Sequence, residues 1–129
     1  MSTALILGAG SDMAAAIAKK FASKGWDLQL AARNVQKLET LEKDFRIRYS
    51  IQCTLHEFDA LEFEAHASFF NGLKPKPDLV VCVFGYMGEN EIVRKNWSET
   101  ARTIHSNYTG AVSILNIAAD YYERKKQGS

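Results

Sequence analysis

The chain has 129 residues, of which 16 are lysine or arginine and 15 are aspartate or glutamate. This length fits one domain with one hydrophobic core, which needs no disulfide to fold. The balanced charge, with only a short basic stretch near the C-terminus, excludes an electrostatic surface for nucleic acid or membrane, so we expect a small-molecule ligand.

Targeting and membrane signals are missing from the sequence. The first residues lack the basic flank and cleavage site of a signal peptide, and no apolar stretch reaches the roughly 18 residues of a membrane span. The cysteines, Cys53 and Cys82, both fall in predicted strands and fit reduced thiols. We therefore expect a cytoplasmic protein.

The first predicted element is a strand that runs into a glycine turn. The largely apolar run Thr3–Leu7 is followed by glycines at positions 8 and 10, and then by a helical pattern. Such a turn lets backbone amides approach a phosphate, whose charge the helix N-terminus favours. It predicts dinucleotide binding, although the third small residue of the full fingerprint is replaced here by Met13. The expected cofactor-binding residues of the turn are Gly8, Gly10, Ser11, Asp12 and Met13.

The next elements continue a strand and helix alternation. A first helix ends at Gly25, the strand Trp26–Ala32 follows, and a second helix opens at Asn34, a good N-cap. Both helices carry apolar residues at helical spacing, which predicts that each packs on a sheet. These apolar positions are Ala14, Ile17, Ala18, Phe21 and Ala22 in the first helix, and Val35, Leu38, Leu41 and Phe45 in the second.

Four further elements are predicted. Tyr49–Leu55 alternates apolar and polar residues, as an edge strand does, and Leu61–Phe70 has a helical pattern. Leu79–Phe84 is apolar throughout, which predicts a central parallel strand covered on both faces. From Ser98 a long helix reaches close to the C-terminus, and its wide apolar face predicts packing against both the sheet and another helix or a partner.

The alternation of strands and helices predicts the fold class. Right-handed crossovers give a three-layer, doubly wound α/β domain of Rossmann type, with a parallel sheet in the order 3-2-1-4. We expect residues 1–129 to form a single NAD(P)-binding domain. In that order Cys53 and Cys82 lie roughly 14 Å apart, too far for a disulfide.

The residue after the second strand bears on the choice of nucleotide. An NAD-binding domain places a carboxylate there, whereas this chain has Arg33. A guanidinium binds a 2′-phosphate through two hydrogen bonds, which favours NADP over NAD. The alternative is that Arg33 is an ordinary solvated loop residue.

Taken in order, these landmarks resemble the short-chain dehydrogenase/reductase family over the whole chain. The resemblance implies that Gly8 belongs to the cofactor phosphate turn, that Arg33 selects NADP, and that Asp59 contacts adenine. Gly85 closes the segment that matches the family's Asn-Asn-Ala-Gly on the fourth strand. Asn107 in Asn-Tyr-Thr-Gly looks like the family's catalytic-site asparagine, which breaks a long helix and holds a water, with a plain surface helix residue as the alternative.

The sequence departs from the family pattern at several positions. Counting from Gly8, Asp12 and Ala14 stand at the second and third glycines of the phosphate turn. A carboxylate close to a pyrophosphate would repel it, so we expect Asp12 to turn away and cap the helix. Residues 82–84 read Cys-Val-Phe in place of Asn-Asn-Ala. These changes indicate a divergent member.

The resemblance also implies that the family's catalytic serine, tyrosine and lysine are absent from this chain, because family members run to roughly twice its length. Tyr121 with Lys125 and Tyr122 with Lys126 have the family's Tyr-x-x-x-Lys spacing. They follow Asn107 too closely, and we expect a basic, amphipathic helix end there instead. The chain is thus expected to be the cofactor-binding half, truncated before the later strands and inactive alone.

The expected function is that of an NADP-dependent oxidoreductase acting on a carbonyl or an alcohol. A homodimer is expected, joined along Leu79–Phe84 or through the last helix. One alternative is a non-catalytic nucleotide-binding or assembly module. Another is a methyltransferase, which normally needs a carboxylate where Ala32 and Arg33 stand. The histidines have no metal spacing, and no hydrolase or phosphate-loop motif occurs, so these classes are excluded.

Overall fold

A computed structural model describes residues 2–129. Within them, four strands form one sheet in the order β3-β2-β1-β4, and every neighbouring pair is parallel. Ala4 pairs with Leu28 on one side and with Leu79 on the other. The strands are β1 (Thr3–Leu7), β2 (Asp27–Ala32), β3 (Cys53–Glu57) and β4 (Leu79–Cys82). The predicted strand order is confirmed.

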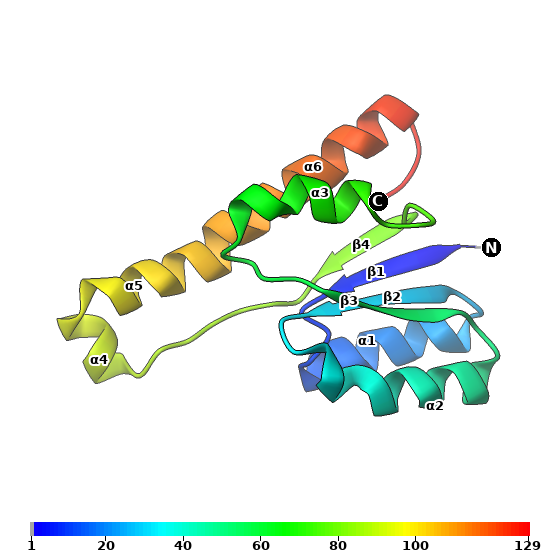
Figure 1. Ribbon diagram of the computed structural model, residues 1–129, viewed down its shortest axis with the longest axis horizontal. Coiled ribbons are helices and arrows are strands. Elements are labelled where there is room, and N and C mark those ends of the chain that lie inside the picture. Colours follow the sequence, from blue (N-terminus) through cyan, green and yellow to red (C-terminus); the bar gives the residue numbers. More distant parts are fainter. Residues whose placement is uncertain (1) are drawn as a thin grey trace.

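Helices cover both faces of this sheet, as Figure 1 shows. The helices α1 (Asp12–Ser23) and α2 (Glu39–Tyr49) lie on one face, and α3 (His66–Asn71) and α6 (Gly110–Lys125) lie on the other. The predicted three-layer Rossmann-type architecture is therefore present.

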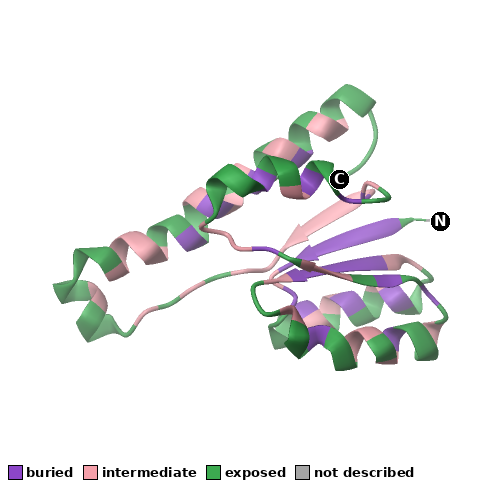
Figure 2. Cartoon of the chain, viewed as in Figure 1, coloured by how far each residue is buried: buried purple, intermediate pink, exposed green. Residues whose placement is uncertain are grey.

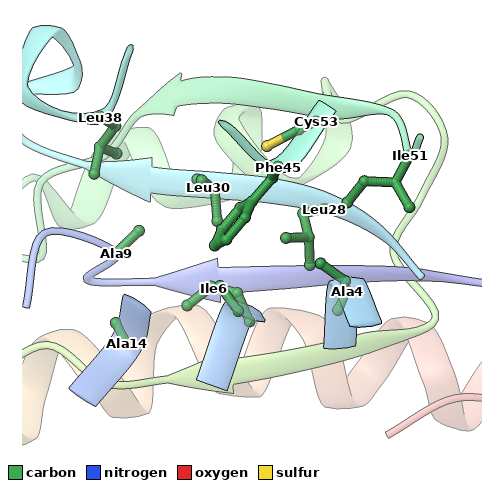
Figure 3. Close-up of a cluster of buried hydrophobic side chains, with 12 residues drawn as sticks. Ala4, Ile6, Ala9, Ala14, Leu28, Leu30, Leu38, Phe45, Ile51 and Cys53 are labelled. Carbon is green, nitrogen blue, oxygen red and sulfur yellow. The ribbon is translucent and has the colours of Figure 1, made fainter. Parts of the chain in front are cut away.

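β1 organises the core because its side chains alternate between the two faces. Ala4 and Ile6 point toward α1 and α2, where they pack with Leu28, Leu30 and Phe45 (Figure 3). Leu5 and Leu7 point the other way, into a cluster with residues of α3 and α6. All five β1 residues are buried, and exposure increases outward to the solvent faces of the helices (Figure 2).

The strand predicted over Tyr49–Leu55 begins later than expected. Tyr49 is the last residue of α2 and packs on Phe45, with 6.0 Å between their ring centroids. Ser50 then takes a left-handed conformation, with φ 55°, and ends the helix. β3 starts only at Cys53 and, as predicted, lies at an edge of the sheet. The same alternation of apolar residues thus served a helix end, a connector and a strand.

Two helix starts also differ from the prediction. Asn34 makes no capping hydrogen bond through its side chain, because a 3₁₀ turn, Val35–Leu38, precedes α2. A second 3₁₀ turn, Phe63–Ala65, precedes α3, so that only the part of the expected helix from His66 to Phe70 is α-helical, and α3 ends one residue later at Asn71.

The predicted long helix is present but is not uniform. It begins with α5 (Trp97–Ile104), passes through a π-helical turn at His105–Thr109, and continues as α6. A short helix, α4 (Asn90–Lys95), which the sequence analysis did not predict, precedes it and lies at the far end of the long helix from the C-terminus (Figure 1). As expected for its wide apolar face, α6 packs on β4 and on α3.

β4 is half-buried rather than central, which corrects the prediction of a strand fully covered on both faces. Its side chains do reach both core clusters, but no complete strand lies outside it within residues 2–129. Among the described residues, Ser129 alone forms backbone hydrogen bonds along this edge. The Ser129 amide donates to the Asp78 carbonyl at 3.0 Å, and the Val80 amide donates to the Ser129 carbonyl at 2.7 Å. Cys53 and Cys82 are both free thiols, as expected.

Candidate functional site

The glycine turn crosses the carboxyl edge of the sheet between β2 and β4. The amides of Gly8 and Ala9 both donate to the Ala31 carbonyl, at 2.9 and 3.0 Å. Gly8 has φ +80°, and a Cβ at this position would lie 2.6 Å from the Phe84 backbone. Only glycine avoids both the strained conformation and the overlap. The turn is thereby held against the segment that leaves β4.

The turn ends at a capped helix N-terminus, but the capping residue is not the one expected. The Ser11 hydroxyl accepts a hydrogen bond from the Ala14 amide at 3.1 Å and is the N-cap of α1. Asp12 is the first helical residue, where its charge still complements the helix dipole. The prediction that Asp12 caps the helix is therefore wrong, because the hydroxyl one residue earlier holds that position. The first two amides of α1, at Asp12 and Met13, have no intrahelical acceptor.

In front of this turn lies a cavity of about 480 Å³. It brings together six of the predicted site residues: Gly8, Gly10, Ser11, Arg33, Asp59 and Gly85. A Cβ at Gly10 would meet no atom within 4 Å, so the space before the turn is open. The other three predicted site residues, Asp12, Met13 and Asn107, do not line the cavity, and Met13 is 68% exposed.

Arg33 and Asp59 enter the site at the ends of neighbouring strands. Arg33 directly follows β2, is exposed, and forms no ion pair among those found within residues 2–129. Asp59 follows β3, and its carboxylate accepts a hydrogen bond from the Leu61 amide at 2.9 Å. Both residues also line a second, smaller hollow with Glu57 and Glu62. The guanidinium is thus available to an anionic group at the cavity.

Asn107 acts on the site through the backbone of Tyr86. Its side-chain oxygen accepts from the Tyr86 amide, and its Nδ2 donates to the Tyr86 carbonyl at 2.7 Å. It lies in the middle of the π-helical turn, an irregularity that often marks functional positions in helices. A Cβ at Gly85 would lie 3.4 Å from Asn107 Oδ1. The helix is therefore irregular at Asn107, and the Asn107 side chain holds the loop after β4 through Tyr86.

Tyr86, which lines the cavity, forms a polar cluster with Glu99 and Arg102. Its hydroxyl donates to Glu99 Oε2 at 2.7 Å, and the Arg102 guanidinium lies 4.3 Å from its ring centroid. The hydrogen bond to Glu99 raises the pKa of the Tyr86 phenol. Arg102 lines the cavity, and its buried Nε has no hydrogen-bond partner in the described part of the chain.

Sequence reasoning missed several residues that line the cavity, namely Phe58, Tyr86, Arg102 and Ser106. Two of these residues could have been predicted from the sequence. Phe58 precedes Asp59, and Tyr86 follows Gly85, so each adjoins a residue already assigned to the site. Arg102 and Ser106 are four residues apart and share a helix face, but nothing local indicates that this face turns toward the sheet.

Other candidate sites are not supported by the structure. Tyr122 donates to the Pro77 carbonyl at 2.8 Å, which places the Tyr121 and Tyr122 end of α6 at the amino edge of β4, opposite the cavity. Residues 2–129 contain no group of three or more side chains arranged to bind a metal. Among the same residues, no helix combines the length and the apolarity needed to span a bilayer.

The architecture and the cavity together define a Rossmann-type nucleotide-binding fold. Its glycine turn, helix N-terminus and strand-end residues meet at the carboxyl edge of a parallel sheet, where such folds bind ligands. The family profile described as short chain dehydrogenase matches residues 2–129. The chain belongs to the short chain dehydrogenase family.

The chain is similar in sequence to known oxidoreductases and similar in fold to solved dehydrogenase structures. An uncharacterized oxidoreductase of Mycobacterium tuberculosis is 30% identical over an alignment covering 96% of this chain and 51% of the relative. A short-chain dehydrogenase from Sphingobium yanoikuyae in complex with NADPH superposes with a TM-score of 0.87 at 22% identity, covering 99% of this chain and 51% of that one. An alcohol dehydrogenase from the archaeon Thermococcus sibiricus, complexed with 5-hydroxy-NADP, superposes with a TM-score of 0.81 at 26% identity, over 96% of this chain and 54% of that one. The chain spans about half the length of these proteins.

Proposed function

We propose that residues 1–129 are one NADP-binding domain of an oxidoreductase that reduces a carbonyl or oxidises an alcohol. The observation that carries the proposal is the exposed Arg33 guanidinium, which forms no ion pair within residues 2–129 and lines the same cavity as the glycine turn. The NADP compounds bound to two proteins of this fold support the same choice of nucleotide. The thiols of Cys53 and Cys82 are both free, which fits a cytoplasmic location.

Each site residue has a role in this proposal. The open space before Gly10 admits the pyrophosphate, and the N-terminus of α1 favours its negative charge. Ser11 keeps the first turn of α1 in place for this contact. The Asp12 side chain lies outside the cavity lining, so its charge does not oppose binding there.

The remaining contacts concern the two ends of the nucleotide. Arg33 binds the 2′-phosphate, and Asp59 contacts adenine across the cavity. Gly85 and the loop that Asn107 holds border the path toward the reacting end. When bound, the nicotinamide supplies or accepts a hydride. We propose that this chain binds the cofactor without turning over substrate, because within residues 2–129 no tyrosine and lysine pair lines the cavity.

Calorimetric titration of the chain with NADPH and with NADH tests the proposal. Loss of a charge-assisted phosphate contact of about 1.5–3 kcal/mol predicts that Arg33→Ala weakens NADPH binding by roughly 10- to 150-fold and leaves NADH unchanged. Arg94→Ala, which removes an exposed arginine from α4, is the matched control. If the chain binds neither nucleotide, the alternative of a non-catalytic assembly module is favoured.

A homodimer through the long helix is the second part of the proposal. Ile104, Tyr108, Val112 and Leu115 recur at helical spacing and are all exposed, Tyr108 to 70%. Such an apolar stripe fits a twofold interface. The edge of β4 is less suited, because the Val80 amide already pairs with Ser129. Light scattering at micromolar concentration tests this, and a monomer for both the parent chain and Tyr108→Glu would refute it.

A further inference from the structure

His66 lies behind the wall of the cavity, outside every motif discussed above. It is the first residue of α3, and only 1% of its surface is exposed. Its ring stacks on Phe58, with 4.9 Å between the centroids and 26° between the planes. Nε2 lies 3.0 Å from the Asp59 carbonyl oxygen, and Nδ1 lies 2.7 Å from the Ser113 hydroxyl on α6. One buried imidazole therefore joins three elements.

The partners of His66 define the hydrogens on its ring. A carbonyl oxygen only accepts, so Nε2 must carry a hydrogen and donate it to Asp59. In the neutral ring Nδ1 is then the acceptor, and the Ser113 hydroxyl donates to it. Both nitrogens are satisfied, as a buried imidazole requires. An apolar side chain would fill the same space without either bond.

The segment that His66 holds is the part of the cavity wall containing Asp59. Phe58, Asp59 and Ala60 all line the cavity. Ala60 also touches α6, because a Cβ at Gly110 would lie 2.5 Å from the Ala60 carbonyl oxygen. The backbone of this segment is thus fixed from behind, by close approach of α6 at Ala60 and by the hydrogen bond from His66 at Asp59.

We propose that His66 is a positioning residue, which together with Ser113 sets the place of the Asp59 carboxylate for recognition of the adenosine half of the nucleotide. The proposal rests on the function proposed above. The Asp59 carbonyl is held through Nε2, and its carboxylate is oriented by the Leu61 amide at 2.9 Å. Freeing the carbonyl lets the Phe58–Ala60 segment rotate, and the carboxylate then leaves its place in the cavity wall.

Two isosteric substitutions separate positioning from packing. Glutamine places an amide nitrogen near Nε2, whereas asparagine places its amide near Nδ1. His66→Gln therefore keeps the bond to Asp59, and His66→Asn keeps only the bond to Ser113. With adenosine 2′,5′-bisphosphate as the probe, we expect His66→Asn to weaken binding about 10-fold and His66→Gln to stay within about threefold of the parent chain.

Further variants complete the design. Ser113→Ala removes the other partner of the ring, and we expect a loss in the same direction of about threefold. Its matched control is Ser68→Ala, an exposed serine on α3, and His56→Asn is the control for the histidine change. The controls are expected to bind like the parent chain. Ser113→Ala also keeps the proposal testable if His66→Asn fails to fold.

Hydrogen exchange at the Leu61 amide provides a reading that does not depend on any nucleotide. We expect faster exchange in His66→Asn and an unchanged rate in His66→Gln. Equal losses of binding and protection in both variants, or none in either, would overturn the positioning role. If the parent chain binds no nucleotide, the proposed function fails, while the exchange rates still decide whether His66 fixes the segment around Asp59.

Discussion

Alanine substitution at three glycines separates backbone strain, steric overlap and loss of the ligand space. Gly8 and Gly25 have nearly the same positive φ, +80° and +82°, but only Gly8 faces a neighbour, the Phe84 backbone at 2.6 Å. Gly10 has neither a positive φ nor a neighbour within 4 Å. The three positions thus form an internally controlled series.

The expected magnitudes follow from these differences. The left-handed conformation costs about 1–2 kcal/mol for alanine, so Gly25→Ala lowers the free energy of unfolding by that amount. Gly8→Ala adds overlap with backbone that cannot rotate away, about 1–3 kcal/mol more, for a total of about 2–5 kcal/mol. Gly10→Ala changes stability by less than about 0.5 kcal/mol, as exposed positions do. Its methyl group enters the open space before the turn, so NADPH binding is weakened instead.

Urea unfolding of the three variants measures the first two effects, and calorimetric titration with NADPH measures the third. The m-value should stay constant across the series, because the surface exposed on unfolding is the same. Equal destabilisation by Gly8→Ala and Gly25→Ala would refute the role of the Phe84 contact. Unchanged NADPH affinity in Gly10→Ala would refute the assignment of that space to the pyrophosphate.

Two further predictions concern the packing of the thiol and of α6. Burial raises the pKa of the Cys53 thiol from 9.0 to about 12. The folded protein holds this proton more tightly than the unfolded chain, so its contribution is complete below pH 9 and is lost as the pH rises toward 12. Cys53→Ala should flatten the fall of the urea midpoint between pH 8 and 10, and an unchanged slope would contradict this. Gly110→Ala forces α6 away from Ala60 and should destabilise by about 1–3 kcal/mol in urea, whereas Gly72→Ala, with 3.2 Å to the nearest atom, should cost less.

The architecture could be predicted because local patterns determine it. The apolar run of β1 and the glycine turn after it define a strand and the start of a helix within about ten residues. The order of the sheet then follows from the handedness of the connections. The first residue of β3 could not be placed, because Tyr49 and Ile51 have the same alternation whether they end a helix or begin a strand.

The residues of the candidate site, too, could be predicted from the sequence only in part. Arg33 could be found because it directly follows β2, and the ends of parallel strands converge at one edge of the sheet. Asp59, two residues after β3, was assigned only through the resemblance to the family. Arg102 reaches the cavity only because the loop after β4 brings Tyr86 beneath it, at 4.3 Å. His66 is separated from Ser113 by 47 residues, and the periodicity of neither helix predicts the hydrogen bond between them.

The two hydrogen bonds of Ser129 orient its backbone parallel to β4. Its amide and its carbonyl bond to Asp78 and Val80, the residues on either side of Leu79, which is the geometry of one rung in a parallel ladder. A peptide grafted onto Ser129 would therefore grow as a strand alongside β4. At about 3.3 Å per residue, roughly seven added residues would bring it level with Tyr86 in the loop that Asn107 holds. A segment joined to Ser129 would thus be placed to bring new side chains toward the cavity at the carboxyl edge of the sheet.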